Sequence, residues 1–266
     1  MRYVTCRTQK LKVAVVSGGA SGMGRVYALR MAQAGIAVAV LDRSESAMAQ
    51  LAGESANIYT YPCDVTNIEQ VQDIIANIEQ QLGPIERLVH CAAIMPAGAL
   101  AEQSTDSIHQ LMAVNYGGTV NVVRTALPAM HMRNNGEIVI FGSLGGDFPV
   151  PGCGAYCASK AAVNTFAEIL IEETRGSGTH IMLVCPPLVD TPLLEQATAT
   201  GNPKTVRDSI QNKRFATATA MIDAVEKGLH RKTAILYPNG EAKILAWLRR
   251  FSPRLVWKIV HAANKA

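Results

Sequence analysis

Tyr156 and Lys160 lie four residues apart, and this pair is the part of the chain where chemistry is most readily predicted. On a helix that spacing places both side chains on one face. A free phenol has a pKa near ~10, and a neighbouring ammonium group favours the phenolate and lowers that pKa. We therefore expect Tyr156 to act as a general acid and base, with Lys160 lowering its pKa.

Ser143 lies thirteen residues before Tyr156, at the end of an apolar run that is typical of a strand. Its hydroxyl is placed to bind the oxygen of a carbonyl or alcohol while Tyr156 moves the proton. A Tyr and a Lys at this spacing are a weak signal alone, because helices often place them so by chance. The serine and the glycine pattern described next make the signal strong.

A glycine-rich turn at Gly18, Gly22 and Gly24 follows the β-branched run 12–17 and precedes an amphipathic stretch. Such a turn admits the pyrophosphate of a nucleotide, and the helix that follows offers unpaired N–H groups to it. The next apolar run ends at Asp42, eighteen residues after Gly24, where a carboxylate can bind the ribose of an adenosine. A plain glycine loop is the alternative, but it leaves the strand, helix and acid unexplained.

The elements that must position these residues alternate along the chain. Apolar runs predict strands at 12–17, 37–41, 58–63, 87–92, 137–142, 180–185 and 234–237. Amphipathic stretches predict helices at 22–34, 44–53, 67–82, 104–132, 154–175 and 219–230. Alternation of this kind indicates an α/β fold, a Rossmann-type doubly wound parallel sheet of about seven strands with helices on both faces. No linker or repeat divides the 266 residues, so we expect one domain over 1–266.

The spacing Gly18-x-x-x-Gly22-x-Gly24, together with Ser143, Tyr156 and Lys160, resembles the short-chain dehydrogenase/reductase family in its compact, single-domain form. The resemblance covers roughly residues 10–240 and includes three further motifs in the family's order. These are Asp64 after the third strand, Asn115 in a long helix, and the run 186–191 after the sixth strand. It implies an NAD(P)-dependent oxidoreductase that interconverts a secondary alcohol and a ketone by hydride transfer.

The resemblance also implies a role for each matching residue. Ser143, Tyr156, Lys160 and Asn115 would be catalytic, Asn115 by organising a water relay from Lys160. Asp64 would contact adenine and Thr191 the nicotinamide carboxamide; alternatively, Asp64 caps a helix that starts near Thr66, and Asn115 is a helix-surface residue. The residues expected to bind the cofactor are Gly18, Ser21, Gly22, Met23, Gly24, Asp42, Arg43, Asp64, Val65, Ala92, Tyr156, Lys160, Pro186, Val189 and Thr191.

Asp42 favours NAD as the cofactor, because a carboxylate binds both ribose hydroxyls but repels a 2′-phosphate. Arg43 beside it leaves NADP possible, since a guanidinium can pair with that phosphate.

Four positions depart from the family pattern. Ser17 replaces a threonine and keeps the hydroxyl, and Pro187 replaces a frequent glycine and stiffens a loop. Ala93 adds a Cβ where the backbone passes close to the cofactor. His90 loses an amide that would cross-link the sheet; a proton carrier is one interpretation of His90, and a satisfied core histidine is the favoured one.

The segments expected to line the substrate pocket are mainly apolar and hold no Arg or Lys. Their residues are Met95, Leu144, Phe148, Val150, Leu188 and Leu193. Residues 191–218 are expected to form a mobile substrate lid. We therefore expect a neutral, lipophilic substrate: a steroid, long-chain or cyclic alcohol or ketone. This agrees with a weaker likeness to 3-ketosphinganine reductases and hydroxysteroid dehydrogenases.

A catalytically silent nucleotide-binding scaffold is the alternative function. An epimerase or dehydratase is a third class, but it would normally need a larger C-terminal domain.

Six cysteines occur, at positions 6, 63, 91, 153, 157 and 185, without Cys-x-x-Cys or zinc-ligand spacing. We therefore expect no metal and interpret the thiols as free and mostly buried, as suits a reducing cytoplasm. The sequence shows neither a signal peptide nor a spanning segment, which predicts a cytoplasmic protein.

The C-terminal tail, residues 242–266, holds six cations and no acid, interleaved with apolar residues. A basic amphipathic helix over 242–263, interrupted near Pro253, could lie on an anionic membrane or pack on its own domain or a second subunit. A homodimer or homotetramer is expected, and nucleic-acid binding is not, because no recognised module accompanies the charge.

Overall fold

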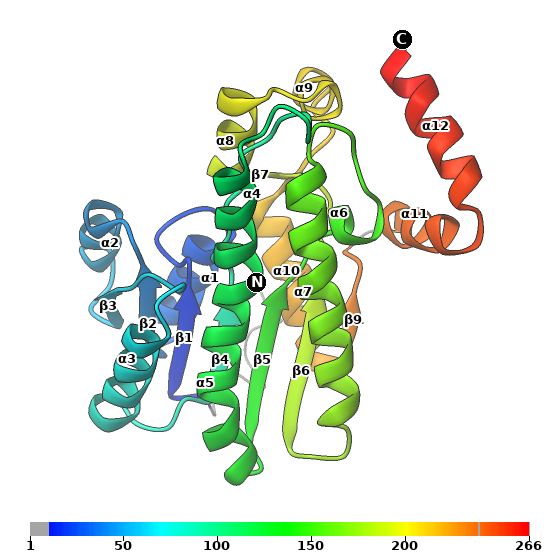
Figure 1. Cartoon of the computed structure of the whole chain (residues 1–266). Helices are drawn as coiled ribbons and strands as arrows, with labels where there is room; N and C mark the ends of the chain where they lie inside the picture. The colour runs from blue at the N-terminus through cyan, green and yellow to red at the C-terminus, as the bar shows by residue number, and fades with distance from the viewer. Residues whose placement is uncertain (1–10, 239, 266) are drawn as a thin grey trace.

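Seven parallel strands form the central sheet of the computed structural model, which describes residues 11–238 and 240–265 (Figure 1). The strands are β1 (Val13–Ser17), β2 (Ala37–Asp42), β3 (Ile58–Pro62), β4 (Arg87–His90), β5 (Gly136–Phe141), β6 (Thr179–Val184) and β9 (Ile235–Leu236). Their order is β3-β2-β1-β4-β5-β6-β9, so the direction of winding reverses between β1 and β4. A crevice for a ligand is expected at this reversal, beyond the carboxyl ends of the strands. The predicted doubly wound sheet is confirmed.

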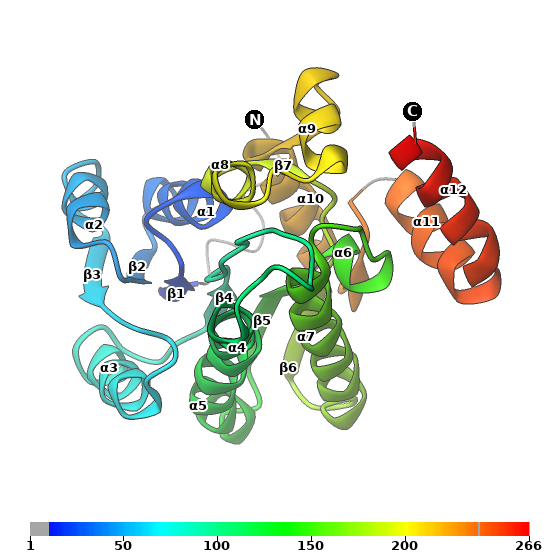
Figure 2. The ribbon, with the colours of Figure 1, turned by 45° about the horizontal axis from the view of Figure 1, so that its top comes forward.

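Helices cover both faces of the sheet (Figure 2). One face carries α3 (Ile68–Gln81), α5 (Gly118–Met132) and α7 (Gly154–Glu173), and the other carries α1 (Gly22–Gln33), α2 (Glu45–Ala52) and α10 (Ala218–His230). Each face of the sheet has its own hydrophobic core, and alternate residues of β1 point into the two cores. Val15 packs in the core under α3, α5 and α7, and Val16 packs in the core under α1, α2 and α10. Because both faces are covered, all of β1 is buried, and its sequence is a continuous apolar run rather than an alternating one.

The helix predicted over 104–132 is three elements. These are α4 (Thr105–Met112), a π-helical turn η2 (Ala113–Gly117) and α5. The turn brings Asn115 to complete burial, where its side chain hydrogen-bonds outside the helix, and Thr119 Oγ1 donates to the Asn115 carbonyl oxygen at 2.6 Å. A π-helical turn inside an α-helix often marks a functional position.

The segment predicted as a lid, 191–218, is largely helical. It holds α8 (Pro192–Thr200), α9 (Lys204–Gln211) and the strand β8 (Ala216–Thr217), which pairs in parallel with β7 (Val189–Asp190). A further short helix, α6 (Leu144–Asp147), follows β5. The strands β4 and β9 are shorter than expected, and the chain after β4 bends towards the glycine turn, where Ala92 approaches Gly18.

The C-terminal tail forms α11 (Gly240–Phe251) and α12 (Pro253–Lys265), so the predicted interruption near Pro253 is confirmed. Ser252 joins them, because a proline cannot continue the hydrogen bonding of the preceding helix. None of the helices in the described ranges has the length and apolar character needed to cross a membrane.

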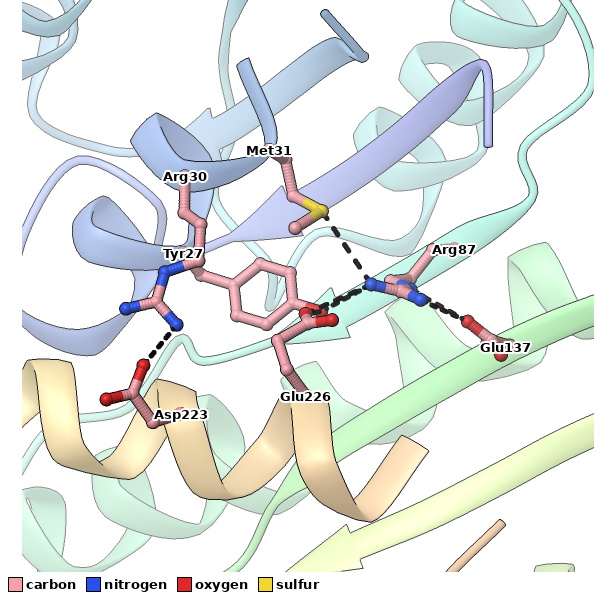
Figure 3. A network of polar contacts seen from close by, with 7 residues as sticks. All are labelled: Tyr27, Arg30, Met31, Arg87, Glu137, Asp223 and Glu226. Atoms are coloured by element: carbon pink, nitrogen blue, oxygen red, sulfur yellow. Dashed lines mark hydrogen bonds and ion pairs between the residues drawn. The ribbon is translucent and has the colours of Figure 1, made fainter. Parts of the chain in front are cut away.

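Arg87, the first residue of β4, is buried at the amino-terminal end of the parallel strands, opposite the crevice. It is the centre of a polar network (Figure 3). Its guanidinium donates to Glu137 Oε2 at 2.5 and 2.9 Å, to Glu226 Oε1 at 3.1 Å and to the Tyr27 hydroxyl at 2.9 Å. The network joins β4, β5, α1 and α10. A buried charge of this kind is tolerated only because it is paired on several sides.

We predict that Glu137→Ala lowers the free energy of unfolding by about 3 kcal/mol, because it removes a partner from a buried guanidinium. Urea unfolding provides the measurement. Arg30→Gln, which breaks only the outer pair with Asp223 at 2.6 Å, is the matched control and should cost less than about 1 kcal/mol. Equal losses in the two variants would contradict the importance of the buried network.

Candidate active site

The glycine turn after β1 is shaped by close backbone contacts. Gly18 has φ +65° and Gly22 has φ +50°, both in the left-handed region that favours glycine. A Cβ on Gly24 would lie 2.2 Å from the Gly18 carbonyl oxygen, and a Cβ on Gly18 would lie 2.6 Å from the Ala92 backbone. No side chain caps the start of α1, since the Ser21 side chain makes no capping hydrogen bond. The turn therefore presents a helix N-terminus suited to an anion.

A cavity of about 580 Å³ lies beside this turn, at the carboxyl ends of β1, β2 and β4. It is lined by eleven of the predicted cofactor residues, namely Gly18, Ser21, Gly22, Met23, Gly24, Asp42, Arg43, Asp64, Val65, Ala92 and Thr191. The remaining four predicted cofactor residues, Tyr156, Lys160, Pro186 and Val189, line a second cleft. Met23, Ala93 and Thr191 line both spaces, so one extended ligand can reach from the first to the second.

The acidic residues of the first cavity are held in place by local hydrogen bonds. Asp42 accepts the N–H of Ala20 at 3.0 Å and that of Ser44 at 3.1 Å. Burial pushes the pKa of Asp64 upward, but hydrogen bonds from Thr66 and the charge of Arg43 hold that pKa below its usual value. The capping alternative for Asp64 is wrong, because α3 begins at Ile68 and its cap is Asn67.

The second cleft, of about 300 Å³, contains Ser143, Tyr156 and Lys160 together. All six predicted substrate-lining residues line it as well, namely Met95, Leu144, Phe148, Val150, Leu188 and Leu193. The three predicted catalytic residues and the six lining residues come from four separate stretches of the chain, so only the fold brings them to one place.

Burial raises the pKa of Tyr156 to about 12, opposed in part by a hydrogen bond with Ser143. We expected Lys160 to lower the pKa of Tyr156, and in this structure the pKa is raised instead. The Lys160 ammonium donates to the Phe141 carbonyl oxygen at 2.8 Å, which ties α7 to the end of β5. Burial lowers the pKa of Lys160 to about 8, and Cys91 and Cys185 act against that change.

Asn115 is fully buried, so the interpretation of it as a helix-surface residue is wrong. Its Oδ1 accepts the N–H of Ile94 at 2.8 Å, and its Nδ2 donates to the Ile94 carbonyl at 3.0 Å and to Ser159 Oγ at 2.9 Å. The amide therefore joins the loop after β4 to α7, next to Lys160. Its predicted part in a proton relay stays a prediction.

Asn164, which the sequence analysis missed, holds the Ser143 backbone. Its Oδ1 accepts the N–H of Ser143 at 3.3 Å, and its Nδ2 donates to the Ser143 carbonyl at 3.0 Å and to Asp147 Oδ1 at 3.1 Å. Asn164 follows Lys160 by four residues, as Lys160 follows Tyr156. The same helical spacing was the signal that could have found it.

Arg214 and Leu245 also line the second cleft and were not foreseen. Arg214 comes from the segment between α9 and β8, and Leu245 from α11. The expectation that the pocket holds no Arg or Lys is therefore wrong for Arg214. Leu245 was missed because α11 folds back to the cleft from far along the chain, whereas Arg214 lies within the predicted lid, 191–218, but was not expected to line the pocket.

His90 cross-links the sheet despite replacing an amide, which corrects the expectation of a lost link. Its Nδ1 lies 2.6 Å from Ser17 Oγ, across the register that pairs these residues of β4 and β1. Its Nε2 is buried without a hydrogen-bond partner among the described residues, so the core histidine is only partly satisfied. Burial, together with Lys160, lowers the pKa of His90 to about 3.

The thiols in the described residues are free, and four of the five are buried; Cys6 lies outside those residues. Burial raises the pKa of both Cys153 and Cys91 to about 12, which disfavours the reactive thiolate. No group of three or more His, Cys, Asp or Glu in the described ranges has an arrangement that could hold a metal ion.

Known proteins resemble this chain over most of its length. The family described as short chain dehydrogenase matches residues 12–202. An oxidoreductase of Staphylococcus saprophyticus is 32% identical over 187 residues, which span 68% of this chain and 80% of that protein. The 3-ketodihydrosphingosine reductase of Mus musculus is 31% identical over 195 residues, which span 70% of this chain but only 59% of the relative. A short chain dehydrogenase/reductase from Burkholderia phymatum, solved in complex with NAD, superposes with a TM-score of 0.81 at 26% identity, covering 92% of this chain and 95% of that one.

We predict that His90 makes the stability of the protein depend on pH. Between about pH 3 and the unfolded value of ~6.5, the unfolded chain binds a proton that folded His90 does not. The free energy of unfolding should therefore fall as pH drops through this window, by up to about 1.4 kcal/mol per pH unit, with full stability above it.

Urea unfolding at several pH values tests this by comparing the natural protein with His90→Asn, which lacks the titrating ring. His230→Asn, at an exposed position at the end of α10, is the matched control and should keep the slope of the natural protein. The same slope in His90→Asn would show that another group sets it.

Proposed function

This chain belongs to the short chain dehydrogenase family and is an NAD(P)-dependent oxidoreductase acting on CH–OH groups, and we propose that its substrate is a lipophilic secondary alcohol or the matching ketone. The observation that carries the proposal is the apolar lining of the cleft around Ser143, Tyr156 and Lys160. The relative named 3-ketodihydrosphingosine reductase supports it, since that name describes the reduction of a long-chain ketone.

The glycine turn fits the pyrophosphate of NAD(P), because a Cβ at Gly18 or Gly24 would collide with the protein backbone, so glycine alone permits this tight turn before the uncapped N-terminus of α1. Eleven of the proposed cofactor residues line this cavity, and two of them, Met23 and Thr191, also line the cleft. When bound, the nicotinamide exchanges a hydride with the carbon that carries the substrate oxygen.

The protein's own groups handle the proton. Ser143 donates a hydrogen bond to the substrate oxygen, and Tyr156 gives its phenolic proton to that oxygen in reduction or takes it in oxidation. The raised pKa of Tyr156 keeps the phenol protonated at neutral pH, which is the form that reduction needs. Lys160, one turn along α7, has a pKa lowered to about 8 and is proposed to exchange protons through the water relay expected beside Asn115.

Residues 191–218 are proposed to act as the substrate lid. Two hydrogen bonds attach α8 to the loop that follows β4: Met95 N–H to Gln196 Oε1 at 2.5 Å, and Ala97 N–H to Thr200 Oγ1 at 2.8 Å. Leu194 of α8 and Val206 of α9 both line the cleft. Opening these attachments would admit a substrate, and closing them would exclude water from the reacting carbon.

Arg214 bears on whether the substrate is neutral. It is exposed, and apart from Lys160 it is the one charged residue in the lining of the cleft within the described chain. A lipophilic ketone with a terminal carboxylate fits such a site as well as a neutral ketone does. A substrate panel therefore needs each apolar skeleton both with and without a terminal acid.

The test of the function is turnover of NAD(P)H with steroid, long-chain 3-keto and cyclic ketones. We predict that Tyr156→Phe loses about 10²–10⁴-fold in kcat on every substrate that the natural enzyme turns over, because the proton donor is gone. Cofactor binding, followed by fluorescence of NAD(P)H, should change little. A Tyr156→Phe enzyme with half its kcat would remove Tyr156 from this role, and turnover of small polar alcohols alone would remove the lipophilic substrate.

We further propose NAD(H) as the preferred cofactor. Asp42 lines the first cavity at the end of β2, and a 2′-phosphate bound beside it would meet a like charge. Arg43 Nε lies 3.8 Å from Asp64 Oδ2, so its charge is partly engaged by a carboxylate. This pairing supports NAD(H), because it draws Arg43 away from a phosphate.

We predict at least about a tenfold preference for NAD(H) over NADP(H) in kcat/KM, and a shift towards NADP(H) in Asp42→Ala, which removes the repelling charge. Asp73→Ala is the matched control, because it removes an exposed acid of α3 that does not line the cavity and should leave the preference of the natural enzyme unchanged. A tenfold preference of the natural enzyme for NADP(H) would overturn the proposal.

A further inference from the structure

The last two helices, α11 and α12, form a hairpin at the edge of the molecule (Figures 1 and 2). We call residues 240–265 the C-terminal hairpin. It contacts the body of the protein through α6 and α9. Because α6 directly follows Ser143, the hairpin lies next to the cleft rather than at a remote end of the chain.

The inner side of the hairpin is packed against the protein. Leu245 lines the cleft, and Val256 and Val260 are buried. The Arg249 guanidinium lies 5.5 Å from the ring centroid of Trp257, an arrangement that joins α11 to α12. The side chains of Trp247, Ile259 and Lys265, which the sequence analysis included in this tail, lie outside the described part.

The outer side of α11 repeats one pair of residue types. Lys243 precedes Ile244, and seven residues later Arg250 precedes Phe251. Seven residues are close to two helical turns, so both pairs lie on one face. All four side chains are exposed, Ile244 at 66% and Phe251 at 64%. This face therefore offers a row of two large apolar side chains beside a row of two cations.

The outer side of α12 has the same mixed character. Arg254, Leu255 and Lys258 are exposed, and on the helix they lie opposite the buried Val256 and Val260. Residues 242–266 contain no acidic residue, and the charge of Arg250 is offset in part by Glu168 of α7, whose pKa it acts to lower. Exposed apolar side chains set among cations are typical of helices that lie in the plane of a membrane surface.

We propose that the outer side of the C-terminal hairpin docks on an anionic lipid bilayer. Ile244, Phe251 and Leu255 enter the boundary between headgroups and acyl chains, and the four cations beside them pair with lipid phosphates. The positive charge of this face favours an anionic bilayer over a second copy of the protein. Two copies of the face meeting across a twofold axis would bring cations against cations.

The docking has a consequence for the substrate, and this consequence rests on the proposed function. Leu245 lines the cleft, and its neighbour Ile244 lies on the docking face. Binding through that face places the cleft beside the bilayer, where a lipophilic ketone is concentrated. The enzyme would then collect its substrate from the membrane.

The experiment is co-sedimentation of the full chain with vesicles of phosphatidylcholine alone or mixed with phosphatidylglycerol, at low and high salt. We expect binding to the anionic vesicles, little to the neutral ones, and weakening with salt. Lys243→Gln with Arg250→Gln should reduce the partition coefficient by about 30-fold, at ~1 kcal/mol for each cation. Ile244→Ser with Phe251→Ser should reduce it by at least about tenfold, because the apolar anchors are removed.

Lys227→Gln with Arg231→Gln is the matched control, since it removes two exposed cations from the end of α10 and should change binding less than about twofold. Thermal melting and turnover of a small water-soluble substrate should be alike in all three double variants. If the natural protein does not turn over that substrate, the result counts against the proposed function and not against docking. Equal binding to neutral vesicles, outer-face variants that bind like the control, or a dimer that only the outer-face variants lose would each overturn the proposal.

Discussion

The amide of Asn164 is the contact on which the arrangement of the site depends. It engages both the N–H and the carbonyl of Ser143 and also bonds Asp147, so one side chain of α7 sets the path of the loop after β5. Lys160, one turn earlier, bonds the carbonyl of Phe141 at the end of the same strand. With these contacts in place, Tyr156 and Ser143 are held by one helix and one strand end rather than by a free loop, which is the rigidity that proton transfer requires.

The site is built by burying polar groups, and the pKa shifts show what that burial does. The phenol of Tyr156 is kept protonated, the charge of Lys160 is disfavoured, and His90 is kept neutral. Each change has desolvation as its largest cause. Ser143 opposes it in part at Tyr156, and Cys91 and Cys185 oppose it at Lys160, whereas at His90 the charge of Lys160 acts in the same direction as burial. Arg87 lies at the amino-terminal end of the strands, away from the cleft. Its charge is paired with Glu137 and Glu226, so the network stabilises the fold and takes no part in the chemistry of the cleft.

The two cavities and the hairpin form one continuous functional side of the molecule. Met23, Ala93 and Thr191 line both the first cavity and the second cleft, and Leu245 of α11 also lines the cleft. The helices α8 and α9 lie over the junction and are attached to the loop after β4. On the proposed function, a substrate would meet a mainly apolar lining to which α8, α9 and α11 all contribute.

The sequence by itself determined the parallel sheet, because buried β-branched runs alternating with amphipathic stretches have few other solutions, and it determined the reaction class through Gly18, Gly22, Gly24, Ser143, Tyr156 and Lys160. These signals are local: each depends on residues within one turn or one strand. The tertiary structure alone decided the π-helical turn that buries Asn115, the link between His90 and Ser17, the position of Arg214, and the return of α11 to the cleft. It also reversed the expected pKa of Tyr156, because desolvation depends on how much of the whole fold surrounds a group. Burial and contacts between distant segments are set by packing across the entire chain, and spacing along the sequence carries no measure of them.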